Sequence, residues 1–130
     1  MSIAIGTKGR ADALVMEENT AAAVGSGSLS VFATPSLAAL MERAAVEALA
    51  PYLAEGESSV GTSLSIAHDA ATPVGMTVWA EAEVTTVDRR KISFTVRAFD
   101  SAGQIGSGTH ERFLVDAAKF TAKAQSRKGT

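Results

Sequence analysis

Three side chains stand out because a hydroxyl, a carboxylate and an imidazole occupy positions from which they could act on a bound molecule: Thr34, Glu42 and His68. Groups of these kinds attack a substrate or exchange protons with it. Each position also has a structural explanation: a helix cap for Thr34, a glutamate reaching water for Glu42, and a hydrogen-bonded core histidine for His68. The residue types alone leave both explanations open.

Thr34 and Glu42 would be positioned by a helix within residues 30–53. Apolar residues recur there at i, i+3, i+4, i+7, i+8, i+11 and i+12, a spacing typical of a helix and not of a strand. They are Leu37, Leu40, Met41, Ala44, Ala45, Ala48 and Leu49. Thr34 followed by Pro35 predicts the helix start, with Thr34 as N-cap, and Pro51 predicts its end. Glu42 lies at the edge of the apolar stripe, where a carboxylate is costly unless it is paired, hydrogen-bonded or facing a cleft.

His68 would be positioned by a strand. Large and small side chains alternate over residues 60–68, and this alternation predicts two faces. One face holds Val60, Leu64, Ile66 and His68, and the other holds Gly61, Ser63, Ser65 and Ala67. In this prediction His68 points inward and Gly61 lies on the opposite face.

Further strands follow along the chain. Residues 76–87 and 91–100 alternate between apolar and polar side chains, and residues 101–103 predict the turn of a hairpin. The strand after this turn contains the two glycines of the segment GSG at 106–108, which indicate a bulge or a close backbone approach. His110 and Arg112 share one face of the same strand and are expected at the surface.

One long helix followed by antiparallel strands predicts an α+β fold for residues 1–130, a single domain in which a curved antiparallel sheet wraps the central helix. The back of the helix, with Ala38, Ala39 and Val46, is apolar as well. A single sheet covers only one side of a helix, so a second copy of the chain is expected to cover the rest. The sequence therefore predicts a homodimer.

Composition excludes several other classes of protein. The net charge of −2 gives no electrostatic reason to expect nucleic acid as a partner. The chain has no cysteine, and two isolated histidines make a poor metal site, so no metal is expected. The N-terminal segment lacks the apolar core of a signal peptide, and no apolar run is long enough to cross a membrane. We therefore expect a cytoplasmic protein that binds no membrane.

Four segments together resemble a known family. These are VFAT before the helix, LMERAAVEALAPYL within it, GTSLSIAHDAATPVGMTV after it and IGSGTHERFLV near the end. They are similar to the corresponding segments of hotdog-fold thioesterases of the fluoroacetyl-CoA-specific type. The resemblance runs over residues 31–123.

The resemblance implies a hotdog fold, a dimer with its acyl-CoA site at the subunit interface, and hydrolysis of a small acyl-CoA thioester. No cofactor is implied, because coenzyme A enters as part of the substrate. The catalytic threonine, glutamate and histidine of the family correspond to Thr34, Glu42 and His68. A substrate-site glycine corresponds to Gly61, and the arginine of the GTHER segment corresponds to Arg112, so both are expected to bind the substrate.

The resemblance also indicates a difference in the acyl pocket. In the fluoroacetyl-specific enzyme, phenylalanines before the VFAT segment form a hydrophobic lid, and the matching residues are Gly25 and Ser28. A different acyl selectivity is therefore expected. Two other functions fit the same fold: an acyl-thioester hydratase or dehydratase, and a non-catalytic module that binds acyl-CoA.

Overall fold

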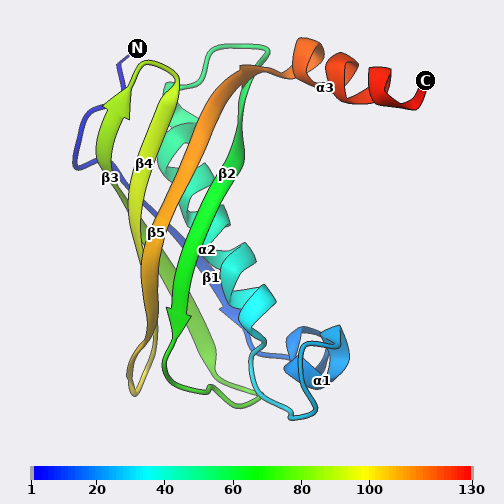
Figure 1. Ribbon diagram of the computed structural model, residues 1–130. Coiled ribbons are helices and arrows are strands. Elements are labelled where there is room, and N and C mark those ends of the chain that lie inside the picture. The colour runs from blue at the N-terminus through cyan, green and yellow to red at the C-terminus, as the bar shows by residue number, and fades with distance from the viewer. Residues whose placement is uncertain (1, 130) are drawn as a thin grey trace.

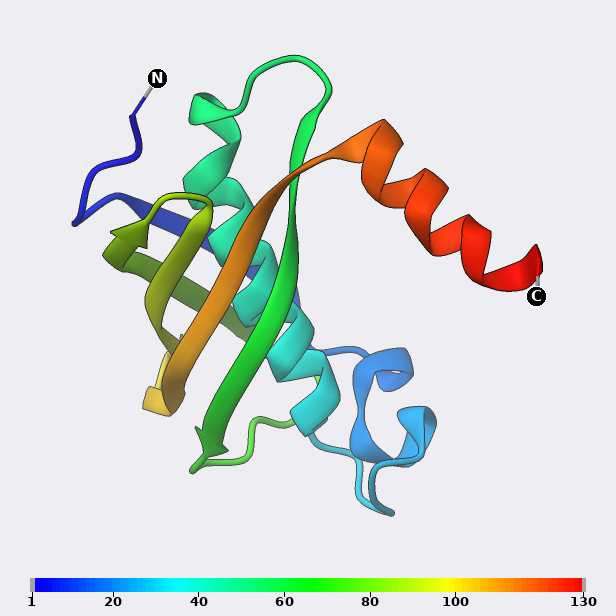
Figure 2. The same cartoon turned by 45° about the horizontal axis from the view of Figure 1, so that its top comes forward.

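The computed structural model describes residues 2–129, which form the predicted α+β fold (Figure 1). Its strands are β1 (Lys8–Leu14), β2 (Glu57–His68), β3 (Thr77–Asp88), β4 (Lys91–Asp100) and β5 (Gly103–Asp116). They form one antiparallel sheet in the order β1-β3-β4-β5-β2. The sheet curves around the long helix α2 (Thr34–Leu49), as Figures 1 and 2 show. β1 and β2 are the two edge strands.

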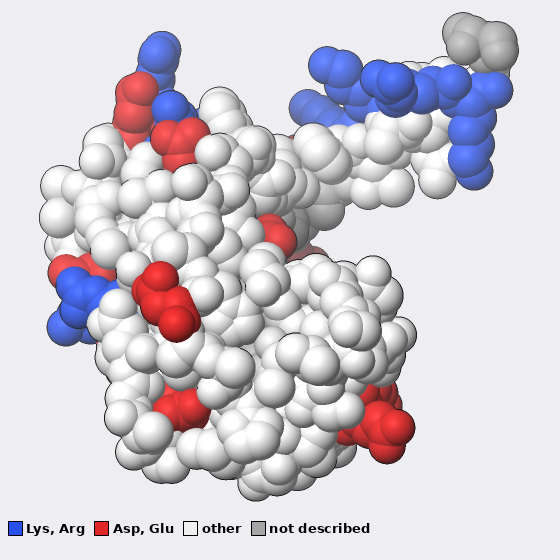
Figure 3. Space-filling model, turned by 60° about the horizontal axis from the view of Figure 1, so that its bottom comes forward, with Lys and Arg blue, Asp and Glu red and all other residues white. Residues whose placement is uncertain are grey.

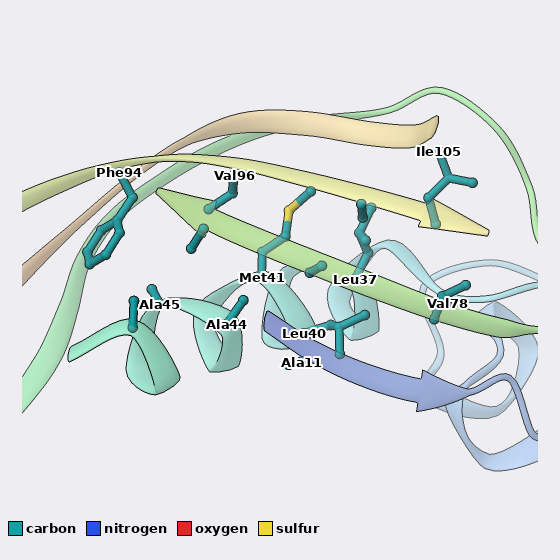
Figure 4. Close-up of a cluster of buried hydrophobic side chains, with 14 of the residues drawn as sticks. Ala11, Leu37, Leu40, Met41, Ala44, Ala45, Val78, Phe94, Val96 and Ile105 are labelled. Carbon is teal, nitrogen blue, oxygen red and sulfur yellow. The ribbon is translucent and has the colours of Figure 1, made fainter. Parts of the chain in front are cut away.

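The apolar stripe of α2 faces the sheet as predicted. All seven residues of the stripe are buried, from Leu37 to Leu49. Figure 4 shows Leu37, Met41 and their neighbours between the helix and the strands. Val46 on the back of the helix is 39% exposed, so the strip that the sequence assigned to a second copy is open in the single chain. The helix ends at Leu49, and Pro51 lies in the 3₁₀ turn η2 (Ala50–Tyr52) that follows.

The sheet supplies the other half of the core through the alternation that the sequence predicts. On β3 and β4 the apolar set that faces the helix is fully or almost fully buried: Val78, Ala80, Ala82, Val84, Ile92, Phe94, Val96 and Ala98. The edge strand β1 lies close to the helix because Gly9 has no side chain. A Cβ atom added at Gly9 would lie 2.2 Å from the carbonyl oxygen of Ala44. The sheet and the helix therefore form two layers that pack closely against each other.

β2 departs from the predicted alternation. Its register against β5 shifts between Gly61 and Ser63, so that Thr62 is an extra residue in the strand. Such a bulge reverses the faces on one side of it. Gly61 consequently faces the helix together with Leu64, Ile66 and His68, and the prediction that placed Val60 on that face and Gly61 on the other was wrong. The bulge brings Gly61 next to the carboxylate of Glu42.

Two short helical segments complete the chain. α1 (Ala21–Val24), preceded by the 3₁₀ turn η1 (Glu17–Asn19), lies near the N-terminal end of α2. α3 (Ala117–Gln125), with η3 (Ser126–Gly129), projects beyond the β2 side of the sheet and buries none of its residues (Figures 1 and 2). Asp116 caps α3, accepting a hydrogen bond from the Lys119 amide at 3.0 Å. No helix among residues 2–129 is long and apolar enough to span a membrane.

Candidate functional site

The first part of the candidate site is a threonine–histidine pair at the N-terminal end of α2. Thr34 Oγ1 lies 2.8 Å from His68 Nδ1, joining the start of the helix to the end of β2 across 34 residues of sequence. The pair borders an open depression of about 330 Å³. The rest of its lining comes from Ala21 of α1 and from the segments 31–32 and 69–71. This depression is large enough for a small acyl group and open enough for a long ligand to enter.

Thr34 does not cap the helix. The N-cap is Ala33, with extended backbone at ψ 145°, and no side chain accepts a hydrogen bond from the first turn there. Thr34 is instead the first helical residue, followed by Pro35. The prediction of a capping hydroxyl was therefore wrong by one residue. The hydroxyl is available to His68 because the helix does not need it.

His68 is only partly satisfied. Its Nε2 atom is buried and has no hydrogen-bond partner among the described residues. Burial lowers the pKa of His68 below its usual 6.5, while the backbone of Ala70 and the charge of Asp69 oppose that shift. The imidazole is therefore neutral at pH 7, and a neutral imidazole can accept a proton.

The second part of the candidate site lies further along α2 and centres on Glu42. Its Oε2 atom accepts a hydrogen bond from Arg112 Nη1 at 3.2 Å, and His110 Nε2 lies 4.0 Å away. The Glu42 side chain is 43% exposed, whereas that of Arg112 is 7% exposed. Glu42 is thus the open end of an otherwise buried polar cluster.

Arg112 is held from several sides. Its Nε donates to Ser59 Oγ at 2.9 Å and its Nη2 to the Ser59 carbonyl at 3.1 Å. Its Nη1 is shared between Glu42 and His110 Nε2, the latter at 3.1 Å. The expectation that His110 and Arg112 lie at the surface was wrong, since both are buried. A guanidinium fixed in this way holds a carboxylate in one orientation.

Gly61 leaves the space that the Glu42 carboxylate occupies. A Cβ atom added at Gly61 would lie 2.4 Å from Glu42 Oε2 and 3.2 Å from both Arg112 Nη1 and His110 Cε1. Any other residue would therefore displace the carboxylate or its partners. The resemblance placed Gly61 in the substrate site, and the structure places it against Glu42.

His110 and Ser59 are members of this cluster that the sequence did not single out as functional. The sequence did hold a sign that His110 lies near another strand, because His110 is on the same face of β5 as Gly106 and Gly108. These glycines let β5 and β2 come close, because added Cβ atoms would lie 2.7 and 2.1 Å from the carbonyl oxygens of Ala67 and Ser65. The close backbone approach that the glycines predicted is confirmed. No such signal exists for Ser59.

The two parts of the site do not meet within one chain. Thr34 and Glu42 are eight residues apart on one helix, which separates them by about 12 Å along its axis. Glu42 is bound to Arg112 and Thr34 to His68. The structure therefore brings together Thr34 with His68, and Glu42 with Gly61 and Arg112, but not all five. Among residues 2–129 no group of three or more histidine or acidic side chains is arranged to hold a metal ion.

Comparisons with known proteins agree on one family. The family model described as fluoroacetyl-CoA-specific thioesterase matches residues 15–118. A fluoroacetyl-CoA thioesterase of Streptantibioticus cattleyicolor is 48% identical over 97 residues, which cover 75% of this chain and 70% of that protein.

Solved structures give the same result in three dimensions. A threonine-to-serine mutant of the fluoroacetyl-CoA thioesterase FlK, in complex with acetyl-CoA, superposes with a TM-score of 0.90 at 39% identity, covering 95% of this chain and 98% of that one. A hot-dog-like protein from Thermanaerovibrio acidaminovorans superposes with a TM-score of 0.85 at 24% identity, covering 95% of this chain and 91% of that one, a likeness that concerns the fold alone. The predicted hotdog fold is confirmed.

Proposed function

This chain belongs to the family of fluoroacetyl-CoA-specific thioesterases and is a thioester hydrolase, and we propose that it cleaves small acyl-CoA thioesters in a site shared by two copies of the chain. Water adds to the acyl carbon, the carbon–sulfur bond breaks, and the products are a free acid and the thiol of coenzyme A. A threonine-to-serine mutant of the relative FlK has a solved structure in complex with acetyl-CoA, which is a thioester of this size class.

The observation that carries the proposal is the Thr34–His68 pair at the end of α2. The first amides of a helix have no partner within the helix and carry partial positive charge. A thioester carbonyl in the adjoining depression would lie near these amides and near the Thr34 hydroxyl, so negative charge developing on its oxygen is stabilised. His68, neutral and partly unsatisfied, would exchange protons there.

Asp69 lies beside the pair, but Glu42, the carboxylate that the resemblance assigns to catalysis, lies elsewhere on the same chain, and a second copy can supply it. The free edge of β2 is the better edge for pairing. It is 12 residues long and contains no lysine, arginine or proline, whereas the edge strand β1 carries Lys8 and Arg10. Charged side chains on an edge strand discourage the addition of another strand. Two β2 edges can therefore pair to give one continuous sheet.

Antiparallel pairing about the middle of β2 also brings the two parts of the site together. His68 ends β2, so in such a pair it lies beside the partner's residues 57–59. Ser59 in that stretch is the residue that holds Arg112, and Arg112 holds Glu42. The His68 of one copy is thereby brought toward the Glu42 cluster of the other. Each dimer would contain two such composite sites.

Two exposed features lie on the side where the second copy would bind. Val46 and the exposed Ala39 share the helix side with Glu42. α3 projects past the β2 edge, and nine residues without packing make a marginal helix in water. Figure 3 shows lysine and arginine side chains along this projecting arm. A homodimer through β2 would cover the apolar strip and give α3 a surface to contact.

In the composite site each residue has a distinct role. Glu42 would attack the acyl carbon or remove a proton from the attacking water, and Arg112 would hold its carboxylate in place. Thr34 would bind the carbonyl or the nucleophile, and His68 would move the proton to the departing thiolate. Gly61 has no side chain and so leaves the space that the Glu42 carboxylate occupies.

The segment next to the depression favours a broad range of short acyl groups. Gly25 ends α1 with a positive φ of 82°, and Ser28 is exposed in the loop after it. Neither can form the apolar lid that phenylalanines at these places would form. Selection for a fluorinated acyl group would therefore be weak. The cytoplasm, where acyl-CoA thioesters are made, is the proposed location.

Release of free thiol from a panel of short acyl-CoAs tests the proposal. Acetyl-, propionyl- and fluoroacetyl-CoA are expected to release thiol with similar efficiency, and a Glu42→Gln variant is expected to release little from any of them. A hydratase or dehydratase would change the acyl chain without releasing thiol. Thermal stabilisation by acyl-CoA without product would indicate a binding module and would overturn hydrolysis.

A further inference from the structure

His110 is the most deeply buried histidine of the chain, and the mechanism above does not use it. It is 1% exposed and lies on β5 between Ser63 of β2 and Phe94 of β4. Its two ring nitrogens are both engaged. Nδ1 lies 2.8 Å from the Ser63 carbonyl oxygen, and Nε2 lies 3.1 Å from Arg112 Nη1.

These two contacts determine where the ring proton is. A carbonyl oxygen only accepts hydrogen bonds, so His110 Nδ1 must carry a proton and donate it to Ser63. A guanidinium nitrogen only donates, so His110 Nε2 must be unprotonated and accept from Arg112. The ring is thus neutral and protonated on Nδ1 alone. An imidazolium would turn a donor toward Arg112 and break the contact.

We propose that His110 is a positioning residue for the reaction: by accepting a hydrogen bond from Arg112 Nη1, it fixes the guanidinium that orients the Glu42 carboxylate. The inference rests on the proposed function, because it concerns the carboxylate that would do the chemistry. Nη1 of Arg112 has two protons, one for Glu42 at 3.2 Å and one for His110 at 3.1 Å. Removing the second acceptor leaves a buried donor unsatisfied, and the guanidinium then shifts to find a partner.

The surroundings keep His110 in the neutral state. Burial lowers its pKa below 6.5, and the positive charge of Arg112 lowers it further, while the Ser63 carbonyl and the carboxylates of Glu42 and Glu111 act in the opposite direction. Protonation at low pH would place a second positive charge beside Arg112. His110⁺ could then compete with Arg112 for Glu42, whose Oε2 lies 4.0 Å from His110 Nε2.

Two substitutions separate positioning from simple packing. In His110→Gln the side-chain oxygen can reach the place of Nε2 and accept from Arg112, but the donor to Ser63 is lost. In His110→Asn the amide nitrogen can take the place of Nδ1 and donate to Ser63, but nothing accepts from Arg112. Both variants lose the stacking on Phe94, at 5.9 Å between ring centroids, so this loss cancels in their comparison.

The expected result is a difference in turnover with folding retained. The kcat of His110→Asn is expected to fall about tenfold with little change in KM, while His110→Gln retains most of the wild-type kcat. His110→Gln should also lose any decline of kcat at low pH that is due to His110. Equal kcat in both variants and the wild type would overturn the positioning role. A wild-type chain that releases no thiol would instead overturn the proposed function.

A spectroscopic measurement tests the same inference without any activity. ¹⁵N spectra of the histidine ring nitrogens, assigned by the signal missing in His110→Gln, distinguish protonated from unprotonated nitrogen. At pH 7.5 the His110 ring is expected to be protonated on Nδ1 and unprotonated on Nε2. A ring protonated on Nε2, or on both nitrogens, would contradict the contact with Arg112.

Discussion

The two ends of the proposed site differ in how completely their polar groups are bonded. At the start of α2, Thr34 is exposed, and Nε2 of His68 has no hydrogen-bond partner among the described residues. Around Glu42, every nitrogen of the Arg112 guanidinium has an acceptor. The first region has unused hydrogen-bonding capacity for a ligand. The second region uses its capacity to hold one carboxylate.

This difference shows how a small protein can combine reactivity with precision. Groups that bind a changing substrate must have donors or acceptors that are not already hydrogen-bonded. A charged catalytic group, in contrast, must be held in one orientation and not turn toward solvent. Thr34 of the first region and Glu42 of the second lie on one helix, so their spacing is fixed by the helical rise. The single chain keeps them apart, and the proposed dimer brings each next to the other region of its partner.

The largest effect is expected for Glu42→Gln. The substitution preserves size and leaves an oxygen for Arg112, but it removes the negative charge needed to attack carbon or accept a proton. Turnover should fall about 100-fold, while the melting temperature stays close to that of the wild type because the side chain is partly exposed. Thiol release and thermal unfolding measure the two quantities. Near-normal turnover would remove Glu42 from the mechanism.

A smaller effect is expected for Gly61→Ala, with Gly108→Ala as its matched control. At Gly61 the new methyl group meets the movable end of Glu42, whereas at Gly108 it would lie 2.1 Å from the carbonyl oxygen of Ser65. Gly61→Ala should therefore fold and lose about 30-fold in kcat through a displaced carboxylate. Gly108→Ala should lose about 2 kcal/mol or more of stability. An active, stable Gly61→Ala variant would show that Glu42 needs no fixed position.

A still smaller effect is expected at Thr34, where two substitutions separate the role of the hydroxyl from the role of the side-chain shape. Thr34→Val removes the hydrogen bond to His68 and keeps the volume, so kcat should fall about tenfold. Thr34→Ser keeps the hydroxyl and should stay within a few-fold of the wild type. Because Thr34 is not the helix cap, neither change should lower the melting temperature appreciably. Large destabilisation by Thr34→Val would restore the capping role.

The smallest expected effect is a decrease in folding stability at low pH. Burial lowers the pKa values of His68 and His110 below 6.5, so the unfolded chain binds protons more tightly than the folded one. Their contribution to stability is complete above about pH 6.5 and is lost as the pH falls through the lower folded values. Melting temperatures measured from pH 8 to pH 5 should decline below pH 6.5, and less steeply in His110→Gln. A melting temperature that rises over this range would contradict the buried neutral rings.

The sequence predicted most of the fold because its patterns are local. The stripe from Leu37 to Leu49 and the alternation of β3 and β4 depend only on neighbours in the chain, and all are buried as expected. Thr62 is different, because nothing in its type marks it as an extra residue. The bulge arises from pairing with β5, and its effect is to turn Gly61 toward the helix.

The site was predictable only in part, for the same reason. Thr34, Glu42 and His68 were found as separate residues, and only the resemblance joined them. The contact between Glu42 and Arg112 spans 70 residues of sequence, so no local pattern reports it. The burial of His110 and Arg112 likewise depends on the packing of β5 beneath α2, which alternation along one strand does not define.

The claim that each site is shared by two copies is tested most directly by combining two inactive variants. Glu42→Gln and His68→Ala chains, carrying different affinity tags, would be co-expressed and the mixed dimer purified through both tags. In a shared site one of the two centres has an intact Thr34 and His68 from one chain and an intact Glu42 from the other.

The mixed dimer is therefore predicted to release thiol at about half the rate of a doubly tagged wild-type dimer, although both parent variants are nearly inactive. A site contained within one chain has no intact copy in this dimer. A mixed dimer no more active than its parents, or the failure of the tagged chains to associate, would contradict the shared site.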